Sequence, residues 1–592
     1  MRFEVPPVSP SVLARETAAD GGATPIQFGD LVSPLSGWYH PPGGARRAGG
    51  IVLCNPVGDD LVRAHRPLRH LAERLAGAGF PVLRFDYRGT GDAAGDETEA
   101  ARVPGWLSDV AAAVDELRVR SGVAHVTLVG LRAGAVLAAA SAGREDVDAV
   151  VLWSGYTGGG AFVDDAVRTH RLHKKLEPQA FSGGPPAPGG EEALGFFLSD
   201  ETMTALRAIE LSAVPVRRAL VVGAEPEAVA AALPGAEHRQ IPADRFLIVP
   251  PHQGALPEEA LAAISTWLEE LYPERAGGVI PPSRPARISP IPGEEPHWIP
   301  GARPLFGILN RPVAPRAGVP AIVMLNAGCV PRMGAHRQYV PLARQWSSLG
   351  FSVLRLDLSG IGDSPVAAGA EENLTYPPGG LADVDQALAW LTGETGAQRF
   401  VLVGLCSGAD IAFSAAHDPR VSGIVMMNPR TFCVYDLGMV ESFKGARWYQ
   451  DSMKRKDSWV KLLRGEVDLV RVARAVAPKA AQLLGRKVKG LVAHGEDDSV
   501  PARLQALCER GVDVFLVVAP HDPGIDYVDA NFAAGMRALG MVPGFERATI
   551  DGTDHTFTAL WAQQQVAELI TDHLVARHLT APVQPGEAAV SA

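Results

Sequence analysis

The stretch that decides the fold is RFVLVGLCSGADIAFSAAH, which runs from Arg399 to His417. Its first part is a short apolar run rich in valine, as in a buried strand, and its last part reads as a helix. Between them Gly404-Leu405-Cys406-Ser407-Gly408 fits the pattern G-x-nucleophile-x-G, which is typical of a sharp turn from a strand into a helix. We therefore predict that Cys406 is a nucleophile held on this turn.

The position suits a thiolate. Cys406 would lie at a helix N-terminus, where the helix dipole favours a negative sulfur. The amide N–H of Ser407 would be free to bind an oxyanion, whereas the Ser407 hydroxyl is expected to point away from the site. The alternative role of Cys406 is that of a buried structural thiol.

The chain contains an internal duplication. AHRPLRHLAERLAGAGFPVLRFDYRGTGD begins at Ala64, and AHRQYVPLARQWSSLGFSVLRLDLSGIGD begins 271 positions later at Ala335. Further on, HVTLVGLRAGA carries Gly130 where RFVLVGLCSGA carries Gly404. Matching segments in the same order at a nearly constant offset predict two tandem copies of one fold.

Each copy alternates short apolar runs with amphipathic stretches, which predicts an α/β fold with a mostly parallel sheet flanked by helices. The predicted division is a first domain over 24–273, a Pro-rich linker over 274–300, a second domain over 301–579 and a disordered tail over 580–592.

The chain resembles the α/β-hydrolase superfamily, in particular bacterial hydrolases of the serine aminopeptidase-like and exosortase-system-associated groups. The residues that carry this resemblance are MGAHRQYVPLAR from Met333, GFSVLRLDLSGIGDS from Gly350 and VGLCSGA from Val403. It implies two tandem α/β-hydrolase domains, with a helical cap at about 430–486 over the second site. Cys406 stands where most members carry serine, which is similar to dienelactone hydrolases, polyester synthases and some thioesterases.

The resemblance also implies the order nucleophile, acid, base along the chain. In VKGLVAHGEDDSVP, members carry the acid three residues after Gly495, which selects Asp498, with Asp497 as the second candidate. A solvated acidic turn is the alternative for this segment. The sequence ATIDGTDHTFT resembles the histidine loop of the family and makes His555 the expected base.

Other candidates are weaker. His521 in APHDPG is set aside because no strand is expected to lead into it, and His494 and His336 are expected to be structural. The second oxyanion donor is expected to be the amide of Cys329 or Gly328, after the run AIVMLN. The Cys329 thiol is expected to be an apolar filler rather than a reactive group.

Arg332 and Arg337 flank the same loop. They are candidates for binding a substrate carboxylate or phosphate, and the equal alternative is that they pin the loop.

The first copy lacks all three catalytic residue types. Arg132 stands at its nucleophile position, Pro226 at its acid position and Arg245 at its histidine position. Because arginine cannot be deprotonated in a protein, Arg132 cannot attack a carbonyl. We predict a non-catalytic domain, whose two arginines either bind an anion or, as we favour, pair with local acids.

The predicted cap is rich in positive charge. Seven basic residues are interleaved with aromatic side chains: Lys444, Arg447, Lys454, Arg455, Lys456, Lys461 and Arg464. They form either a solvated helix face or a docking surface for an acyl carrier protein.

The composition of the chain argues against several classes of protein. The 592 residues exceed one core, and the net charge of −11 argues against nucleic-acid binding. Five widely spaced cysteines argue for a reducing compartment rather than for a disulfide framework. With no signal-like N-terminus and no long apolar run, we expect a cytoplasmic protein that does not enter the membrane, and no cofactor or metal.

Together these features lead us to expect an acyltransferase or thioesterase that acts on an ester or thioester through an acyl-enzyme on Cys406. A plain ester or peptide hydrolase is the alternative within enzymes. The alternative of another class is a non-catalytic binding or scaffold protein.

Overall fold

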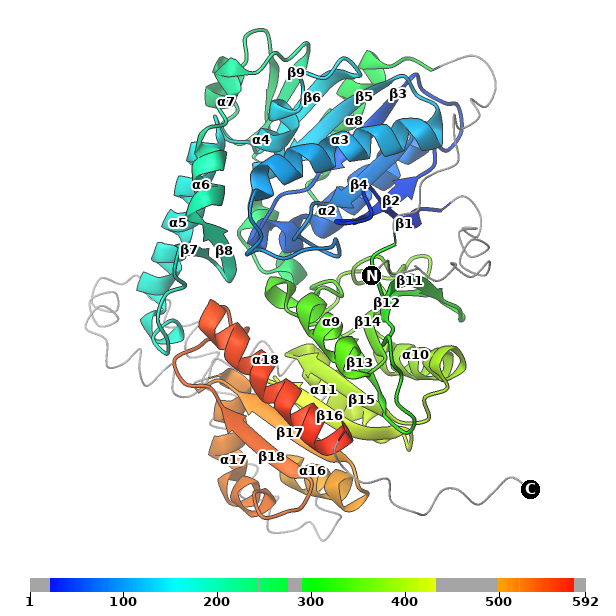
Figure 1. The fold of residues 1–592 in the computed structure, drawn as a ribbon, viewed down its shortest axis with the longest axis vertical. Helices are drawn as coiled ribbons and strands as arrows, with labels where there is room; N and C mark the ends of the chain where they lie inside the picture. The colour runs from blue at the N-terminus through cyan, green and yellow to red at the C-terminus, as the bar shows by residue number, and fades with distance from the viewer. Residues whose placement is uncertain (1–21, 243, 275–289, 433–498, 521, 580–592) are drawn as a thin grey trace, which may run out of the picture.

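The computed structural model describes residues 22–242, 244–274, 290–432, 499–520 and 522–579. They form two domains, one above the other in Figure 1, and each is built on an eight-stranded sheet with helices on both faces. The tail over 580–592 and nearly all of the predicted cap over 430–486 lie outside the described residues.

The sheet of the first domain has the strand order β1-β2-β4-β3-β5-β6-β9-β10. Strand β2 is antiparallel to β1 and β4, and all pairs from β4 to β10 are parallel. The strands are β1 (Thr24–Phe28), β2 (Leu35–His40), β3 (Gly49–Cys54), β4 (Val82–Asp86), β5 (His125–Leu131), β6 (Val147–Trp153), β9 (Ala219–Gly223) and β10 (Glu237–Gln240). A separate hairpin consists of β7 (Gly190–Ala193) and β8 (Phe196–Ser199).

The second domain repeats this order as β11-β12-β14-β13-β15-β16-β17-β18, with the same parallel and antiparallel pairs. The strands are β11 (Glu294–Ile299), β12 (Leu305–Asn310), β13 (Ala321–Leu325), β14 (Val353–Asp357), β15 (Phe400–Leu405), β16 (Val421–Met427), β17 (Asp513–Val518) and β18 (Phe545–Thr549). The structure thus confirms two tandem, mostly parallel sheets flanked by helices. The linker is shorter than the predicted range 274–300. Strand β11 begins at Glu294, within that range, and already belongs to the second sheet.

Helices cover both faces of each sheet. In the first domain α2 (Asp59–Gly77) and α8 (Glu258–Leu271) pack on one face, and α3 (Arg102–Ser121) and α4 (Ala133–Ala140) pack on the other. The remaining helices of this domain are α5 (Gly159–Leu176), α6 (Asp200–Arg207) and α7 (Glu227–Ala231). Because both faces are covered, central strands such as β3 are buried at every position.

The second domain is layered in the same way. Helices α9 (Tyr339–Leu349) and α18 (Leu560–Leu574) cover one face of its sheet. The opposite face packs against α10 (Gly380–Thr395), α11 (Ser407–Ala415), α16 (Val500–Glu509) and α17 (Pro523–Leu539). This arrangement places the C-terminal ends of β15, β17 and β18 at one edge of the sheet, where a site can form.

The domains meet through their antiparallel edge strands. Trp38 of β2 packs against Phe306 of β12 and Trp298 of β11, with ring centroids 4.6 and 5.8 Å away. This aromatic cluster joins the two domains, whose sheets stay separate, as Figure 1 shows.

Buried ion pairs cross the same interface. Arg84 of β4 pairs with Asp363 of the second domain, and Arg355 of β14 pairs with Asp92 of the first. Each arginine and each aspartate lies 271 positions from its counterpart in the other copy. The two domains therefore exchange equivalent contacts, as the subunits of a two-fold symmetric dimer do.

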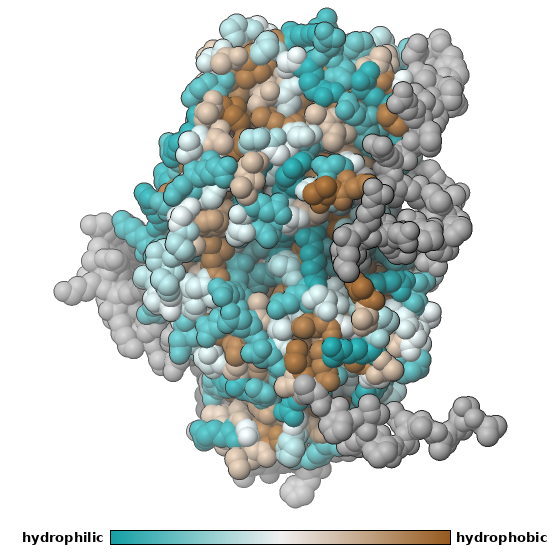
Figure 2. Space-filling model, in the orientation of Figure 1, coloured by the Kyte–Doolittle hydropathy of each residue, from teal (hydrophilic) through white to brown (hydrophobic). Residues whose placement is uncertain are grey.

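The surface is mixed in character. On the face shown in Figure 2, apolar patches are scattered among polar ones rather than gathered in one large area. Among the described residues, no helix combines the length and the hydropathy that crossing a membrane requires.

Candidate active site

Cys406 lies on the turn between β15 and α11, with φ 59° and ψ −122°. Residues other than glycine rarely adopt this backbone conformation. The turn is also tight, because a Cβ on Gly404 would lie 2.2 Å from the carbonyl carbon of Gly408. A Cβ on Gly408 would lie 2.7 Å from the carbonyl oxygen of Asn326. On this strained turn Cys406 is buried, with 8% of the residue exposed.

His555 lies in the loop between β18 and α18 and connects Cys406 to a carboxylate. Its Nδ1–H donates a hydrogen bond to Asp522, and its Nε2 is buried without a hydrogen-bond partner among the described residues. Although burial lowers the pKa of His555, the charge of nearby Cys406 and the contact with Asp522 raise it well above its usual value. The imidazole of His555 therefore contacts Asp522 directly and lies close enough to Cys406 to respond to its charge.

The carboxylate on His555 is one that the sequence analysis did not select. Asp522 is fully buried, follows β17 and caps α17 by accepting a hydrogen bond from the N–H of Gly524 at 3.0 Å. Asp498 and Asp497, the predicted candidates, lie outside the described residues. The acid that the structure brings to His555 is thus Asp522.

The sequence did contain a signal for Asp522. It follows the apolar run DVFLVV by four residues and precedes a Pro-Gly pair that opens a helix. The sequence analysis set His521 aside because no strand leads directly into it, and β17 ends three residues earlier, at Val518. His521 itself, like His494, lies outside the described residues.

Two polar side chains, buried Asn428 and partly buried Asp554, hold the histidine loop. Asn428 donates from its side-chain amide to the carbonyl of His555 at 2.8 Å and accepts from the N–H of Ala519 at 2.7 Å. Asp554 accepts from the N–H of Thr558 at 2.6 Å. Asn428 thus connects the loop of the base to the end of β17, which carries the acid.

The groups expected to bind an oxyanion lie at the start of α11 and in the loop after β13. The side chain of Ser407 is fully buried and its Oγ accepts from the N–H of Gly328 at 2.9 Å, which engages one candidate amide. For the amide of Cys329, no hydrogen bond is found within the described ranges, so Cys329 stays the candidate for the second donor. Burial raises the pKa of the Cys329 thiol to about 12, so this thiol stays protonated.

Arg332 and Arg337 are not available to a substrate. The guanidinium of Arg332 is buried against Asp92 at 2.7 Å, Asp357 at 2.7 Å and Asp363 at 2.9 Å. Arg337 is also buried and donates to the main-chain oxygens of 91, 93 and 95 in the first domain. Two roles were predicted for these arginines. The structure supports the one in which they pin the loop, and the prediction that they bind a substrate carboxylate or phosphate is wrong.

The first domain also borders the catalytic loops. Phe181, which follows a short 3₁₀ turn after α5, belongs to the same buried apolar cluster as Cys406. It forms a β-bridge with Thr553, two residues before His555. His336, predicted to be structural, is buried and lies 3.3 Å from the hydroxyl of Thr556 in the same loop. A wall of the second site therefore comes from the first domain.

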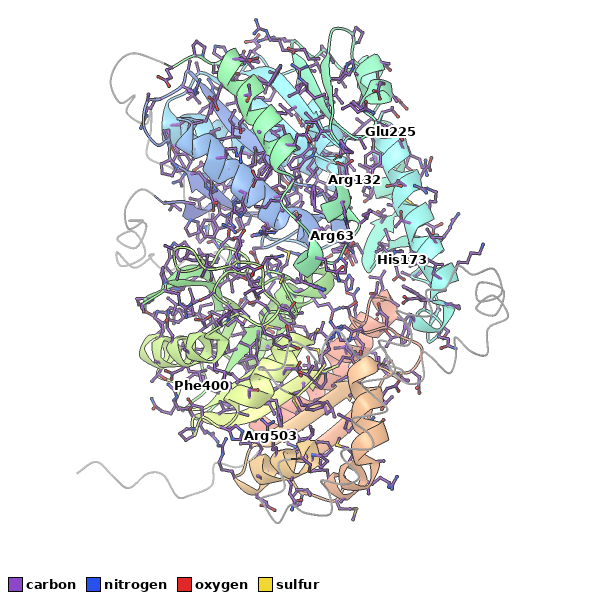
Figure 3. All side chains as sticks on the ribbon, turned by 180° about the vertical axis from the view of Figure 1, so that it is seen from behind. Arg63, Arg132, His173, Glu225, Phe400 and Arg503 are labelled. Carbon is purple, nitrogen blue, oxygen red and sulfur yellow. The ribbon has the colours of Figure 1, made fainter. Side chains whose placement is uncertain are left out.

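The equivalent turn in the first domain keeps its shape without its nucleophile. Arg132 has φ 56° and ψ −120°, nearly the values of Cys406, and pairs with Asp60 and Asp165. Pro226 precedes α7, and Arg245 lies in a 3₁₀ turn. The predicted pairing with local acids is thus observed for Arg132, and Figure 3 places it in the first domain, far from Phe400 in the second.

Within the residues that the structure describes, no cluster of three or more His, Cys, Asp or Glu side chains could hold a metal ion. The groups assembled around Cys406 are those of acid–base and nucleophilic chemistry.

Comparisons with known proteins agree with this architecture. A family model described as serine aminopeptidase, S33, matches residues 61–180, and one described as alpha/beta hydrolase fold matches residues 320–487. Two uncharacterized proteins from strains of Mycobacterium tuberculosis are 35% identical over 126 residues, which is 21% of this chain. The match spans only 42% of the length of these relatives.

Solved structures that are similar to this chain match it at low identity. An α/β serine hydrolase without lid from Xanthomonas campestris is 16% identical, with 44% of this chain and 100% of that chain covered and a TM-score of 0.30. Proline iminopeptidase from Mycobacterium smegmatis is 15% identical, with coverages of 48% and 99% and a TM-score of 0.29. The two family matches and the repeated strand order lead to one conclusion: the chain carries two domains of the α/β-hydrolase fold in tandem.

Proposed function

We propose that the second domain is a cysteine-dependent acyl hydrolase or acyltransferase that forms a thioester on Cys406. The observation that carries this proposal is the placement of Cys406 on a strained turn beside His555, whose other ring nitrogen is bound by buried Asp522. A thiol, a base and an acid in that order are the parts that nucleophilic acyl transfer requires.

In the first half of the reaction, His555 takes the proton of Cys406 and the thiolate attacks the acyl carbonyl. The carbonyl oxygen becomes negative and is bound by the main-chain N–H groups of Ser407 and Cys329. When the carbonyl re-forms, the bond to the leaving alcohol or thiol breaks and His555 returns its proton to that group. The product is an acyl thioester on Cys406.

In the second half, water or another acceptor attacks the thioester carbonyl while His555 takes the proton of the acceptor. The carbon–sulfur bond breaks, the sulfur of Cys406 leaves as the thiolate, and the proton on His555 passes to that sulfur, which restores the starting state. Asp522 keeps the Nδ1–H tautomer and stabilises the imidazolium at both stages. The first domain, with Arg132 at its turn, is proposed to be non-catalytic.

The test is formation of a covalent adduct. Incubation with a small neutral thioester and with a p-nitrophenyl ester should add the mass of one acyl group to the wild-type protein. Cys406→Ala should form no adduct and lose turnover by on the order of 10⁴-fold or more. Cys508→Ala, which removes a buried thiol on α16, is the matched control and should behave as wild type. Undiminished turnover by Cys406→Ala would exclude the assignment.

For the acyl donor, we propose a carrier-bound substrate that approaches the basic segment between Lys444 and Arg464. The support is the sequence alone, since seven cations on an acidic protein attract anionic partners. Changing Arg455, Lys456 and Arg464 to Glu should raise KM for an acyl carrier protein and leave a neutral thioester unaffected. The defect should shrink as salt rises, because exposed charges are screened. Equal loss of both substrates would contradict docking at this segment.

A further inference from the structure

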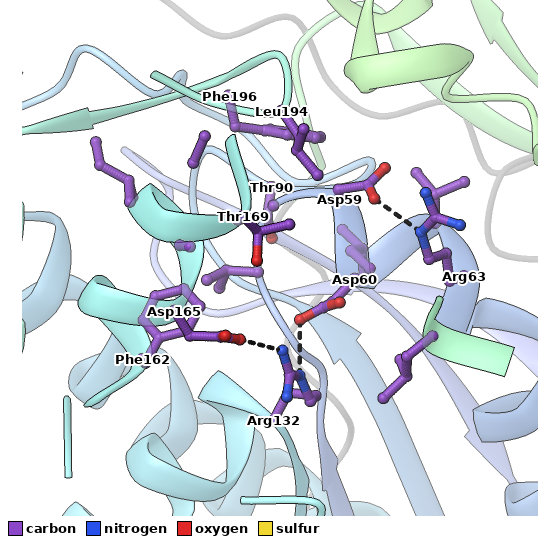
Figure 4. Close-up of a pocket in the computed structure, with 18 of the residues that line it drawn as sticks. Asp59, Asp60, Arg63, Thr90, Arg132, Phe162, Asp165, Thr169, Leu194 and Phe196 are labelled. Carbon is purple, nitrogen blue, oxygen red and sulfur yellow. Dashed lines mark hydrogen bonds and ion pairs between the residues drawn. The ribbon is translucent and has the colours of Figure 1, made fainter. Parts of the chain in front are cut away.

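The first domain encloses a cavity above its unused turn. The turn around Arg132 keeps the strained backbone and the tight glycines of the catalytic copy, since a Cβ on Gly134 would lie 2.2 Å from the carbonyl oxygen of Cys54. Above it lies a cavity of about 410 Å³, which Figure 4 shows in close-up. This volume is within the range of small-molecule sites.

The floor of the cavity is polar but balanced in charge. Arg132 pairs with Asp60 at 3.1 Å and with Asp165 at 2.7 Å, and Tyr156 donates to Asp165 at 2.8 Å. Arg168 also pairs with Asp165. Figure 4 shows Arg132 between Asp60 and Asp165, and beside them a second balanced pair that lines the cavity, Arg63 with Asp59. Neither sign is in excess on the floor.

The walls of the cavity are mostly apolar. They come from α2, from α5, from the β7–β8 hairpin and, at one point, from the second domain. The apolar side chains among them include Leu61, Val62, Phe162, Leu194, Phe196, Phe197 and Met333. Thr169 of α5 also lines the cavity, and exposed Ile248 lies at its margin.

We infer that this cavity binds a small uncharged amphipathic molecule, with an apolar body against the walls and a hydroxyl, ester or amide group on the floor. The apolar walls favour a hydrocarbon body because its burial removes apolar surface from water. The floor offers donors and acceptors for one polar group. It disfavours a net charge, because an anion would meet two carboxylates and a cation two guanidiniums, each already paired.

The occupant would touch both domains. Met333 lies in the loop that also carries Cys329, and Leu194 and Phe196 belong to the segment that borders His336. The inference does not rest on the reaction proposed for Cys406, and its test needs no turnover.

The test uses the full chain and the neutral fluorescent probe N-phenyl-1-naphthylamine. We expect saturable binding that octan-1-ol displaces at concentrations at least roughly tenfold below those of octanoate or protonated octylamine. Thr169→Trp, which fills the cavity, should weaken probe binding at least tenfold. Lys175→Trp, exposed on the same helix, is the matched control and should bind as wild type. Ala166→Phe repeats the test on the same wall if Thr169→Trp fails to fold.

A charge change on the floor gives a second readout. Asp60→Asn keeps the side-chain shape but removes one of the two carboxylates on Arg132, so octanoate should bind roughly tenfold more tightly than to wild type. Probe binding that survives both Thr169→Trp and Ala166→Phe would place the probe elsewhere and overturn the inference. Equal displacement by the alcohol, the acid and the amine would overturn the chemical class, as would an Asp60→Asn variant with unchanged preference.

Discussion

At the scale of single residues, the open question is which carboxylate serves His555. Asp522→Asn should lower kcat by about 10²- to 10⁴-fold, because the amide lacks the charge that supports the imidazolium. The fold should persist, since asparagine caps a helix about as well as aspartate and can still accept from the N–H of Gly524. Asp498→Asn and Asp497→Asn are the matched variants and should stay within a few-fold of wild type. A large loss in Asp498→Asn together with an active Asp522→Asn would transfer the acid role.

At the scale of one element, the strand–turn–helix around Cys406 depends on the absence of a side chain at Gly404. Gly404→Ala should destabilise the protein by about 3 kcal/mol, because the added methyl overlaps the main chain of α11. Gly393→Ala is the matched control on α10, where a Cβ meets nothing within 4 Å, and should stabilise by up to about 1 kcal/mol. Denaturant unfolding midpoints measure both changes. Equal midpoints would show that the turn can relax.

At the scale of the whole molecule, the ion network centred on Asp92 joins the domains. Asp92 binds Arg332 and Arg355 of the second domain, and its loss leaves two buried cations short of a partner. Asp92→Asn should cost about 3–5 kcal/mol and lower the unfolding temperature of both domains. Asp164→Asn, which breaks an exposed pair with Arg207, should cost less than about 1 kcal/mol. Independent melting of the two domains in wild type would contradict a shared network.

The same network predicts how stability depends on pH. Burial by itself raises the pKa of the Asp92 carboxyl. The positive charges of Arg332 and Arg355 together outweigh this effect and lower the pKa to about 2. Because this folded value lies below that of an unfolded aspartate, the contribution is complete above about pH 4 and is lost as pH falls toward 2. Thermal melts between pH 5 and 2 should therefore fall less steeply for Asp92→Asn than for wild type. Parallel curves would show that Asp92 does not contribute.

Short sequence patterns were sufficient to predict much of the fold and part of the candidate site. The repeat and the alternation of apolar runs predicted two parallel sheets, because strands buried on both faces must be apolar throughout. The turn at Cys406 and the loop at His555 were found because each is a short motif whose geometry is set by neighbours in sequence. The prediction that the first domain is non-catalytic rested on the residue types at three positions, above all on Arg132, whose charge cannot be removed.

What the sequence by itself determined was therefore what short-range chemistry fixes: the duplication, the class of each element, and the turn and the loop that carry Cys406 and His555. Only the tertiary structure decided which acid meets His555 and what the arginines of the oxyanion loop do. Asp522 reaches His555 because β17 and β18 are neighbours in the sheet, and Arg332 is engaged because Asp92 of the other domain faces it from 240 positions away. A buried charge takes the partner that the packed chain brings within reach, and sequence spacing does not encode that partner.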